Sequence, residues 1–155
     1  MLNNFKRVIV TGGSGFIGTN LIELLDSRGF SILNIDISAP RNIAQMKFWY
    51  KLDICEQDKL KKIITEFNPH IIFHLAARTD LEGSSLDSYK ANTIGVKNLI
   101  EATCELTALK LTVFASSRLV CRLDYKPKSF DDYSPDTFYG ESKVIGEKFV
   151  RNYGH

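Results

Sequence analysis

Short, fully apolar runs alternate along this chain with longer segments whose apolar residues recur every three or four positions. A short run rich in Val, Ile and Phe is typical of a buried strand, and the longer period is typical of a helix with one face in a core. This pattern predicts five strands, over residues 7–11, 31–36, 47–52, 71–74 and 111–116. It also predicts four helices, over residues 16–28, 56–67, 86–106 and 139–152.

The order of these elements predicts the fold class. Strands that alternate with helices of this length form a parallel sheet covered by helices on both faces, so we expect a doubly wound α/β fold. No linker or repeat divides residues 1–155, which we interpret as one domain. The helix expected over 86–106 is apolar on more than one side, which predicts that more than the sheet covers it.

Three glycines, Gly12, Gly15 and Gly18, follow the first predicted strand at a spacing of three residues. In a dinucleotide site, the first permits a tight exit from the strand, the second lets a pyrophosphate approach the backbone, and the third lets the helix pack closely. The helix then directs its free N–H groups and the positive end of its dipole at the phosphates. The spacing therefore predicts a dinucleotide site, with a glycine turn that binds nothing as the alternative.

Asp36 ends the second predicted strand, eighteen residues after Gly18. A carboxylate there would accept hydrogen bonds from the ribose hydroxyls of an adenosine and would repel a 2′-phosphate. We therefore expect NAD rather than NADP as the cofactor. Arg41 lies five residues further on and weakens the argument against NADP, and an aspartate that serves only the loop is the alternative.

Tyr139 and Lys143 lie four residues apart on the last predicted helix and therefore share one face. An ammonium beside a phenol favours the phenolate, so the pair is suited to take a proton from a substrate hydroxyl while hydride leaves the attached carbon. An isolated pair at this spacing is usually an ordinary helix contact. The location of this pair favours a catalytic role. Ser116 and Ser117 end the strand that precedes it, and ligands bind where parallel strands end.

Composition argues against several other classes of function. The net charge is +2, with 44% hydrophobic and 25% charged residues, so we expect neither a nucleic-acid partner nor a membrane surface. Three widely spaced cysteines argue against a disulfide framework and a zinc site, and they are typical of a reducing cytoplasm. We expect no metal. The N-terminal residues show no signal-peptide core, and no apolar run approaches the length of a membrane span.

Together these motifs resemble the extended short-chain dehydrogenase/reductases, in the NAD-dependent epimerase/dehydratase branch that acts on nucleotide sugars. The matching pieces are TGGSGFIG at 11–18, Asp36, LDI at 52–54, HLAA at 74–77, Asn92-x-x-Gly95 with Asn98-Leu99, SSxxV at 116–120 and YGESK at 139–143. They run in family order and cover essentially the whole chain. The resemblance implies a Rossmann-type NAD-binding domain.

The resemblance also implies site residues. Ser117 would orient the sugar hydroxyl, Tyr139 would be the acid/base, and Lys143 would tune Tyr139 and hold the nicotinamide ribose. The implied cofactor-binding residues are Gly12, Gly15, Phe16, Ile17, Gly18, Asp36, Asp53, Ile54, Leu75, Ala76, Ala77, Asn92, Tyr139 and Lys143. Among them, Asp53 and Ile54 would lie against the adenine.

Ser117 is preferred to its neighbour as the catalytic hydroxyl because it stands three residues before Val120, as the family's hydroxyl does. Ser116 is then a neighbouring contact, and we interpret His74 as structural.

Departures from the family pattern narrow the expected reaction. Members usually have V-Y-G where this chain has Val120-Cys121-Arg122, so the loop toward the sugar is unusual. Dehydratases of the family carry an Asp-Glu pair where this chain has Arg118 and Leu119, which argues against dehydration. Epimerisation of a nucleotide sugar, with a UDP-hexose as the first candidate, needs only the Ser/Tyr/Lys set. A reductase or dehydrogenase of the same family and a truncated, non-catalytic NAD-binding protein are the alternatives.

Similar enzymes are longer by a second domain. We therefore expect residues 1–155 to be the cofactor-binding part, with a sheet incomplete at its C-terminal side, no substrate-binding domain, and no assured activity of its own. Similar proteins often pair through two helices per subunit, which predicts a homodimer to which the helix at 86–106 contributes.

Overall fold

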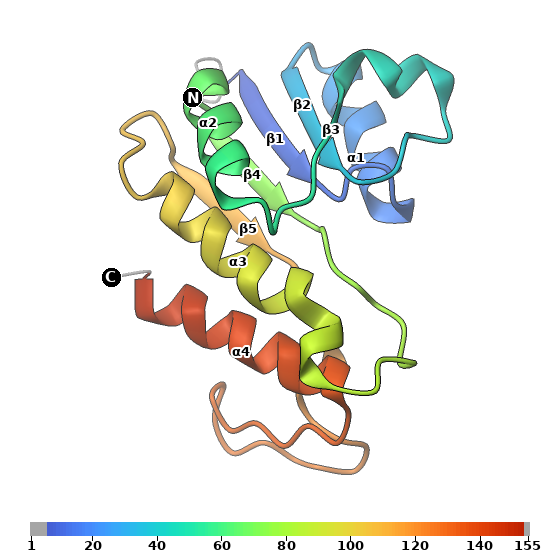
Figure 1. Ribbon diagram of the computed structural model, residues 1–155, viewed down its shortest axis with the longest axis vertical. Coiled ribbons are helices and arrows are strands. Elements are labelled where there is room, and N and C mark those ends of the chain that lie inside the picture. The colour runs from blue at the N-terminus through green and yellow to red at the C-terminus, as the bar shows by residue number, and fades with distance from the viewer. Residues whose placement is uncertain (1–5, 154–155) are drawn as a thin grey trace.

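The computed structural model describes residues 6–153, which form a parallel sheet between two layers of helices (Figure 1). The strands are β1 (Arg7–Thr11), β2 (Ser31–Asp36), β3 (Trp49–Lys51), β4 (Ile71–His74) and β5 (Leu111–Phe114). The α-helices are α1 (Phe16–Ser27), α2 (Gln57–Phe67), α3 (Lys90–Thr103) and α4 (Phe138–Tyr153). Three short 3-10 helices are η1 (Ile43–Phe48), η2 (Leu86–Tyr89) and η3 (Arg118–Val120). The expected doubly wound α/β fold is confirmed.

The strand order β3-β2-β1-β4-β5 places β1 at the centre of the sheet, and every neighbouring pair is parallel. The chain builds outward from β1 to β3 and then returns through α2 to place β4 on the other side of β1. The loops that leave β1 and β4 therefore run in opposite directions at the carboxyl edge. In this class of fold, ligands bind at such a reversal of strand order.

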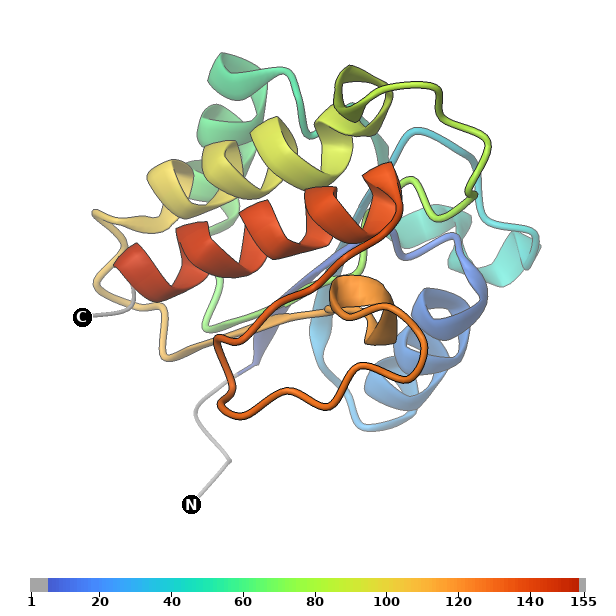
Figure 2. The ribbon, with the colours of Figure 1, turned by 90° about the horizontal axis from the view of Figure 1, so that it is seen from below.

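The two faces of the sheet bury different residues of the same strands. Ile9 of β1 packs with Leu60 of α2 and Leu99 of α3, whereas Val8 packs on the opposite face with Ile22 of α1. Figure 2 shows α1 on one side of the sheet and both α3 and α4 on the other. Burial on both faces explains why the first strand is apolar at every position rather than at alternate ones.

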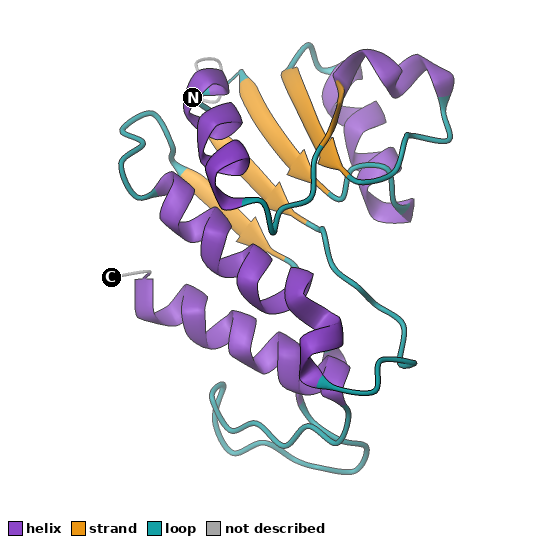
Figure 3. Ribbon diagram, in the orientation of Figure 1, coloured by secondary structure: helices purple, strands orange, loops and turns teal. Residues whose placement is uncertain are grey.

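Helix α3 lies between α2 and α4 on one face of the sheet (Figure 3). Both neighbours and the sheet cover it, which confirms that more than the sheet buries this helix. Its outer surface keeps one exposed large apolar side chain, Ile94, between the exposed Lys90 and Lys97.

Three predicted boundaries need correction. Residues 47–48 belong to η1, because pairing with β2 begins only at Trp49. The segment predicted as one helix over 86–106 is η2 followed by α3, and the helix ends at Thr103. The strand predicted over 111–116 ends at Phe114, which pairs with His74, the last residue of β4. Within residues 6–153, no helix combines the length and the apolarity that crossing a membrane requires.

Candidate functional site

A groove of about 910 Å³ opens at the carboxyl edge of the sheet, where the loops after β1, β2, β4 and β5 meet α4. Its volume is in the range of pockets that hold small molecules and cofactors. The structure brings all but one of the predicted cofactor residues to its walls. These are Gly12, Gly15, Phe16, Ile17, Gly18, Asp36, Asp53, Ile54, Leu75, Ala76, Ala77, Tyr139 and Lys143.

The glycine loop forms one wall of the groove, and its three glycines serve different purposes. Gly12 has a φ of +71°, and a Cβ there would lie 2.5 Å from the backbone nitrogen of Ala76. A Cβ on Gly18 would lie 2.5 Å from the carbonyl oxygen of Gly12. The fold itself therefore requires these two glycines. Gly15 is different, because its Cβ would meet only the Gly12 carbonyl oxygen, at 3.3 Å, so packing does not require a glycine there.

Helix α1 begins at the groove with an uncapped N-terminus. Gly15 is its N-cap, no side chain caps it, and its first turn holds no acidic residue. The first N–H groups of a helix have no intrahelical partner and carry the positive end of the dipole, so an anion is the partner they favour. Phe16 and Ile17 line the same wall and are 87% and 63% exposed. A bound ligand would cover part of this apolar surface.

Asp36 stands at the end of β2 with its carboxylate held in place by backbone donors. One oxygen accepts from the Ser14 N–H at 3.0 Å and the other from the Ser38 N–H at 2.9 Å. Each oxygen keeps a further lone pair, so the carboxylate can also accept from ribose hydroxyls. Arg41, the cation that the sequence predicts near this carboxylate, lines the same end of the groove.

The segment between β3 and α2 forms the far end of the groove. The Cys55 N–H donates to Asp53 Oδ1 at 2.9 Å, and Asn98 of α3 donates from Nδ2 to the Ile54 carbonyl at 3.1 Å. A Cβ on Gly95 would lie 2.4 Å from Ile54 Cδ1, so the glycine of α3 lets Ile54 pack against the helix. The structure thus brings two of the matching pieces, LDI and the Asn92-x-x-Gly95 segment of α3, into direct contact.

The chain that leaves β4 stays hydrogen-bonded to the last residue of β1. The Leu75 N–H donates to the Thr11 carbonyl at 3.0 Å, and the Ala76 N–H donates to Thr11 Oγ1 at 3.3 Å. His74 is buried, and its Nδ1 lies 2.7 Å from the same Thr11 hydroxyl. Burial, assisted by the charge of Lys143, lowers the pKa of His74 to about 3. His74 is therefore a neutral residue inside the fold.

Tyr139 and Lys143 lie on the first turns of α4 and line the groove from the side opposite to α1. Both are buried, and the ring of Tyr139 lies 6.0 Å from the ring of Tyr89. Lys143 Nζ donates to the Ala115 carbonyl at 2.7 Å, just beyond the end of β5. Desolvation lowers the pKa of Lys143, and the carboxylate of Glu147 opposes that effect.

Ser117 is not among the residues that line the groove, whereas Ser116 is. The Ser117 hydroxyl is the N-cap of η3 and accepts from the Leu119 N–H at 3.1 Å. The Ser116 hydroxyl instead donates to a carboxylate oxygen of Glu147. The role of Ser117 therefore stays a prediction, and the structure gives its neighbour the position beside the groove.

Asn92 is the one predicted cofactor residue that the structure places outside the groove. Its Oδ1 accepts from the Arg78 N–H at 2.8 Å, and its Nδ2 donates to the Arg78 carbonyl and to Ser142 Oγ, both at 2.9 Å. The Ser142 hydroxyl donates in turn to the Tyr139 carbonyl at 2.6 Å. Both N–H groups of the amide and one lone pair of its oxygen are used by this link between α4 and the loop after β4.

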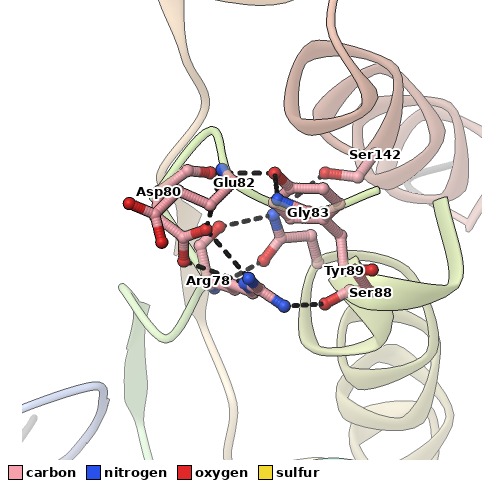
Figure 4. Close-up of polar contacts among 8 residues, drawn as sticks. Arg78, Asp80, Glu82, Gly83, Ser88, Tyr89 and Ser142 are labelled. Carbon is pink, nitrogen blue, oxygen red and sulfur yellow. Dashed lines mark hydrogen bonds and ion pairs between the residues drawn. The ribbon is translucent and has the colours of Figure 1, made fainter. Parts of the chain in front are cut away.

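The loop after β4 is built around Arg78 and Tyr89 (Figure 4). The Arg78 guanidinium donates to both oxygens of Asp80, at 2.8 and 2.9 Å, and to the Ser88 carbonyl at 3.2 Å. The Tyr89 hydroxyl donates to the Asp80 carbonyl at 3.0 Å and accepts from the Gly83 N–H at 3.1 Å. These contacts hold the loop in one shape at the mouth of the groove.

Sequence reasoning missed several residues of the groove. Ser14 and Ser38 supply the backbone donors to Asp36, and Thr79 and Ala91 line the walls. Ser14 lies within the glycine motif and the other three lie close to predicted motifs, so proximity was the available signal. Sequence reasoning also missed Glu147, which follows Lys143 by one helical turn and lines a cavity that shares Lys143 with the groove.

The model of the NAD dependent epimerase/dehydratase family matches residues 8–155. The chain belongs to this family. A crystal structure of the UDP-glucose 4-epimerase of Thermus thermophilus in complex with NAD superposes with a TM-score of 0.78 at 28% identity, covering 96% of this chain and 50% of that one. A dTDP-4-dehydrorhamnose reductase of Bacillus anthracis in complex with NADP superposes with a TM-score of 0.76 at 31% identity, covering 96% and 50%.

A third relative is named for a different class of substrate. The human sterol-4-alpha-carboxylate 3-dehydrogenase, decarboxylating, is 30% identical over 152 residues, which are 96% of this chain and 40% of that protein. The chain thus spans about half the length of the relatives it matches, or less. Relatives that are similarly close to this chain are named for different substrates, and the two crystal structures hold different cofactors.

Proposed function

We propose that this chain builds the NAD-binding half of a nucleotide-sugar epimerase-like enzyme. The observation that carries the proposal is a single groove that joins the glycine loop and Asp36 at one end to the buried pair of Tyr139 and Lys143. The glycine loop and Asp36 are suited to hold a dinucleotide, and Tyr139 with Lys143 is suited to move a proton. The dinucleotide would therefore be a redox partner. The epimerase of Thermus thermophilus, which binds NAD, supports this reading.

The residues of the groove fit NAD. The uncapped end of α1 would bind the pyrophosphate, Asp36 the adenosine ribose, and Lys143 the nicotinamide ribose. A bound NAD would supply the acceptor and donor of hydride for the substrate carbon. Tyr139 would take the proton of the substrate hydroxyl as that carbon is oxidised and give it back on reduction. Lys143 would favour the phenolate of Tyr139 through its charge.

Gly15→Ala tests the cofactor site at a small cost to the fold. The new methyl group would lie 3.3 Å from the Gly12 carbonyl oxygen, and alanine is a poorer N-cap than glycine, so we expect a small fall in the unfolding temperature. We expect NAD affinity to fall at least about tenfold, because the methyl group occupies the space in which the pyrophosphate approaches the backbone. Calorimetric titration with NAD measures the effect.

Gly29→Ala is the matched control, at the other end of α1. Gly29 has a φ of +74° with nothing within 4 Å of its Cβ position, so alanine there costs about 1 kcal/mol of stability and leaves NAD affinity unchanged. If the protein binds neither NAD nor NADP, the proposed function is wrong.

The choice between NAD and NADP rests on Asp36 and Arg41. We propose a preference for NAD, since the carboxylate is held by two backbone donors and would face a 2′-phosphate directly. Asp36→Asn should therefore lower the ratio of the NADP dissociation constant to the NAD dissociation constant about tenfold, chiefly because NADP binds more tightly. Calorimetric titration with both cofactors measures the ratio, and an equal ratio in parent and variant would contradict the assignment.

The second candidate is a one-way reductase or dehydrogenase of the same family. The dTDP-4-dehydrorhamnose reductase that binds NADP favours it, and Arg41 at the groove is compatible with it. A chain of the relatives' full length, mixed with NAD and a panel of UDP-hexoses, separates the two. Inversion at C4 detected by NMR supports epimerisation, whereas net accumulation of NADH supports a dehydrogenase. Binding of NAD without turnover of any sugar would support a non-catalytic NAD-binding protein.

We also propose that the protein pairs with a second copy through α3 and α4. The outer surfaces of these adjacent helices expose Ile94 and Phe138, two large apolar side chains. Light scattering measures the oligomeric state.

A further inference from the structure

We propose that Glu147 is a positioning residue of this site, which fixes the exit of β5 to α4 and supports the charged form of Lys143. The assignment of the site to redox chemistry rests on the proposed function, but the contacts of Glu147 do not. Glu147 lies one helical turn after Lys143 on α4, and both side chains turn toward β5. It is outside every motif that the sequence analysis identified.

The carboxylate of Glu147 is held by three donors from different parts of the chain. One oxygen accepts from the Ser116 hydroxyl, and the other accepts from the Tyr133 hydroxyl at 2.7 Å. Arg151 Nη2 lies 3.4 Å from that second oxygen, and Arg151 Nε donates to the Tyr133 hydroxyl at 3.0 Å. Burial opposes the charge, yet these hydrogen bonds outweigh it and hold the pKa of Glu147 below its ordinary value. Glu147 is therefore an anion at neutral pH.

Two hydrogen bonds run side by side from α4 to consecutive residues beyond β5. Lys143 Nζ donates to the Ala115 carbonyl at 2.7 Å, and the Ser116 hydroxyl donates to Glu147. The first bond, together with the bond from the Ala115 N–H to the His74 carbonyl at 3.0 Å, holds Ala115, but neither bond reaches the chain beyond it. The bond from Ser116 to Glu147 fixes the direction of that chain, and so fixes where the lysine and the following Ser117 stand relative to Tyr139.

The charge of Glu147 acts on the same lysine. Burial disfavours the ammonium of Lys143 and lowers its pKa, and the carboxylate one turn away is the group that opposes this. Lys143 shares its cavity or groove with other titratable groups, which are His74, Arg151, Tyr139, Asp36, Arg41, Asp53 and Arg78. Only the charge of Glu147 raises the pKa of Lys143. His74 is neutral, and Arg151 is already bound to Glu147. Glu147 is thus the negative charge that opposes the effect of burial on the pKa of Lys143.

Glu147→Gln tests the electrostatic part without turnover. The variant keeps the shape of the side chain and removes its charge, so we expect a lower pKa for Lys143. The measurement is the pH titration of the lysine Cε resonance in ¹³C-lysine protein, assigned by its absence in Lys143→Met. A Lys143 titration in Glu147→Gln that superimposes on the parent's would overturn the proposal.

Glu141→Gln is the matched control, because it removes the same charge from an exposed position on the same helix. Its Lys143 titration should superimpose on the parent's. If it instead shifts as far as that of Glu147→Gln, the effect is one of net charge and the proposal fails.

Turnover tests the positioning part in a chain of the relatives' full length. Both Glu147→Gln and Ser116→Ala should lower kcat about tenfold with an unchanged KM, because each removes the second tie between α4 and the strand exit. Ser116 is exposed, so Ser116→Ala also carries the test if Glu147→Gln does not fold. An unchanged kcat in Ser116→Ala would overturn the positioning role. A parent chain without turnover would contradict the proposed function, while the lysine titration would still decide the electrostatic role.

Discussion

Tyr139→Phe is expected to lower kcat about a thousandfold in a chain of the relatives' full length, because the substrate hydroxyl loses the group that takes its proton. The effect should be confined to chemistry. The hydrogen bond of Tyr139 to Ser142 uses its main-chain carbonyl, which remains in the variant. The ring contact with Tyr89 also remains. The unfolding temperature and the calorimetric affinity for NAD should therefore stay at the parent's values.

Tyr153→Phe is the control for loss of a phenol from the same helix. Tyr153 is half exposed at the end of α4, far along the helix from the groove, so its variant should match the parent in every measurement. If Tyr139→Phe turns over at the parent's rate, the acid/base role is wrong. If it loses NAD affinity along with turnover, the loss of turnover reflects the cofactor contact that the resemblance also implies for Tyr139 and does not support the acid/base role.

The parts of the fold that the sequence predicted are those in which neighbours along the chain decide the outcome. Val8 and Ile9 face opposite sides of β1 and are both buried, so an unbroken apolar run marks a central strand without any knowledge of its partners. The turn at Gly12 could be predicted for a similar reason, because a positive φ directly after a strand strongly favours glycine.

The parts that could not be predicted depend on partners far along the chain. The periodic pattern runs through 86–89 without a break, yet the Tyr89 hydroxyl bonds to Asp80 and Gly83, and residues 86–89 form the turn η2 before α3 begins. The resemblance implies that Asn92 binds the cofactor, and that role stays a prediction. Its amide is bound to residues 14 and 50 positions away, a pairing that only the folded chain reveals.

Acid is expected to destabilise this protein through His74, starting near pH 6.5. The folded state holds the imidazole neutral, with a pKa of about 3, whereas the unfolded chain protonates it at its ordinary value of 6.5. Below pH 6.5 the unfolded state therefore binds one more proton than the folded state. The stability that His74 contributes is present above that pH and is lost as the pH falls toward 3, by about 1.4 kcal/mol for each pH unit.

Denaturant unfolding at pH 7 and pH 5 measures this slope above the range in which most carboxylates titrate. His74→Asn keeps an acceptor for the Thr11 hydroxyl and cannot be protonated, so its stability should fall by about 2 kcal/mol less than the parent's over that interval. His70→Asn is the control, because that imidazole is only half-buried and the variant should keep most of the parent's slope. Should His74→Asn fail to fold, imidazole NMR of the parent decides the point: a His74 resonance that titrates between pH 7 and pH 5 means that the folded state accepts the proton, and the buried neutral histidine is then wrong.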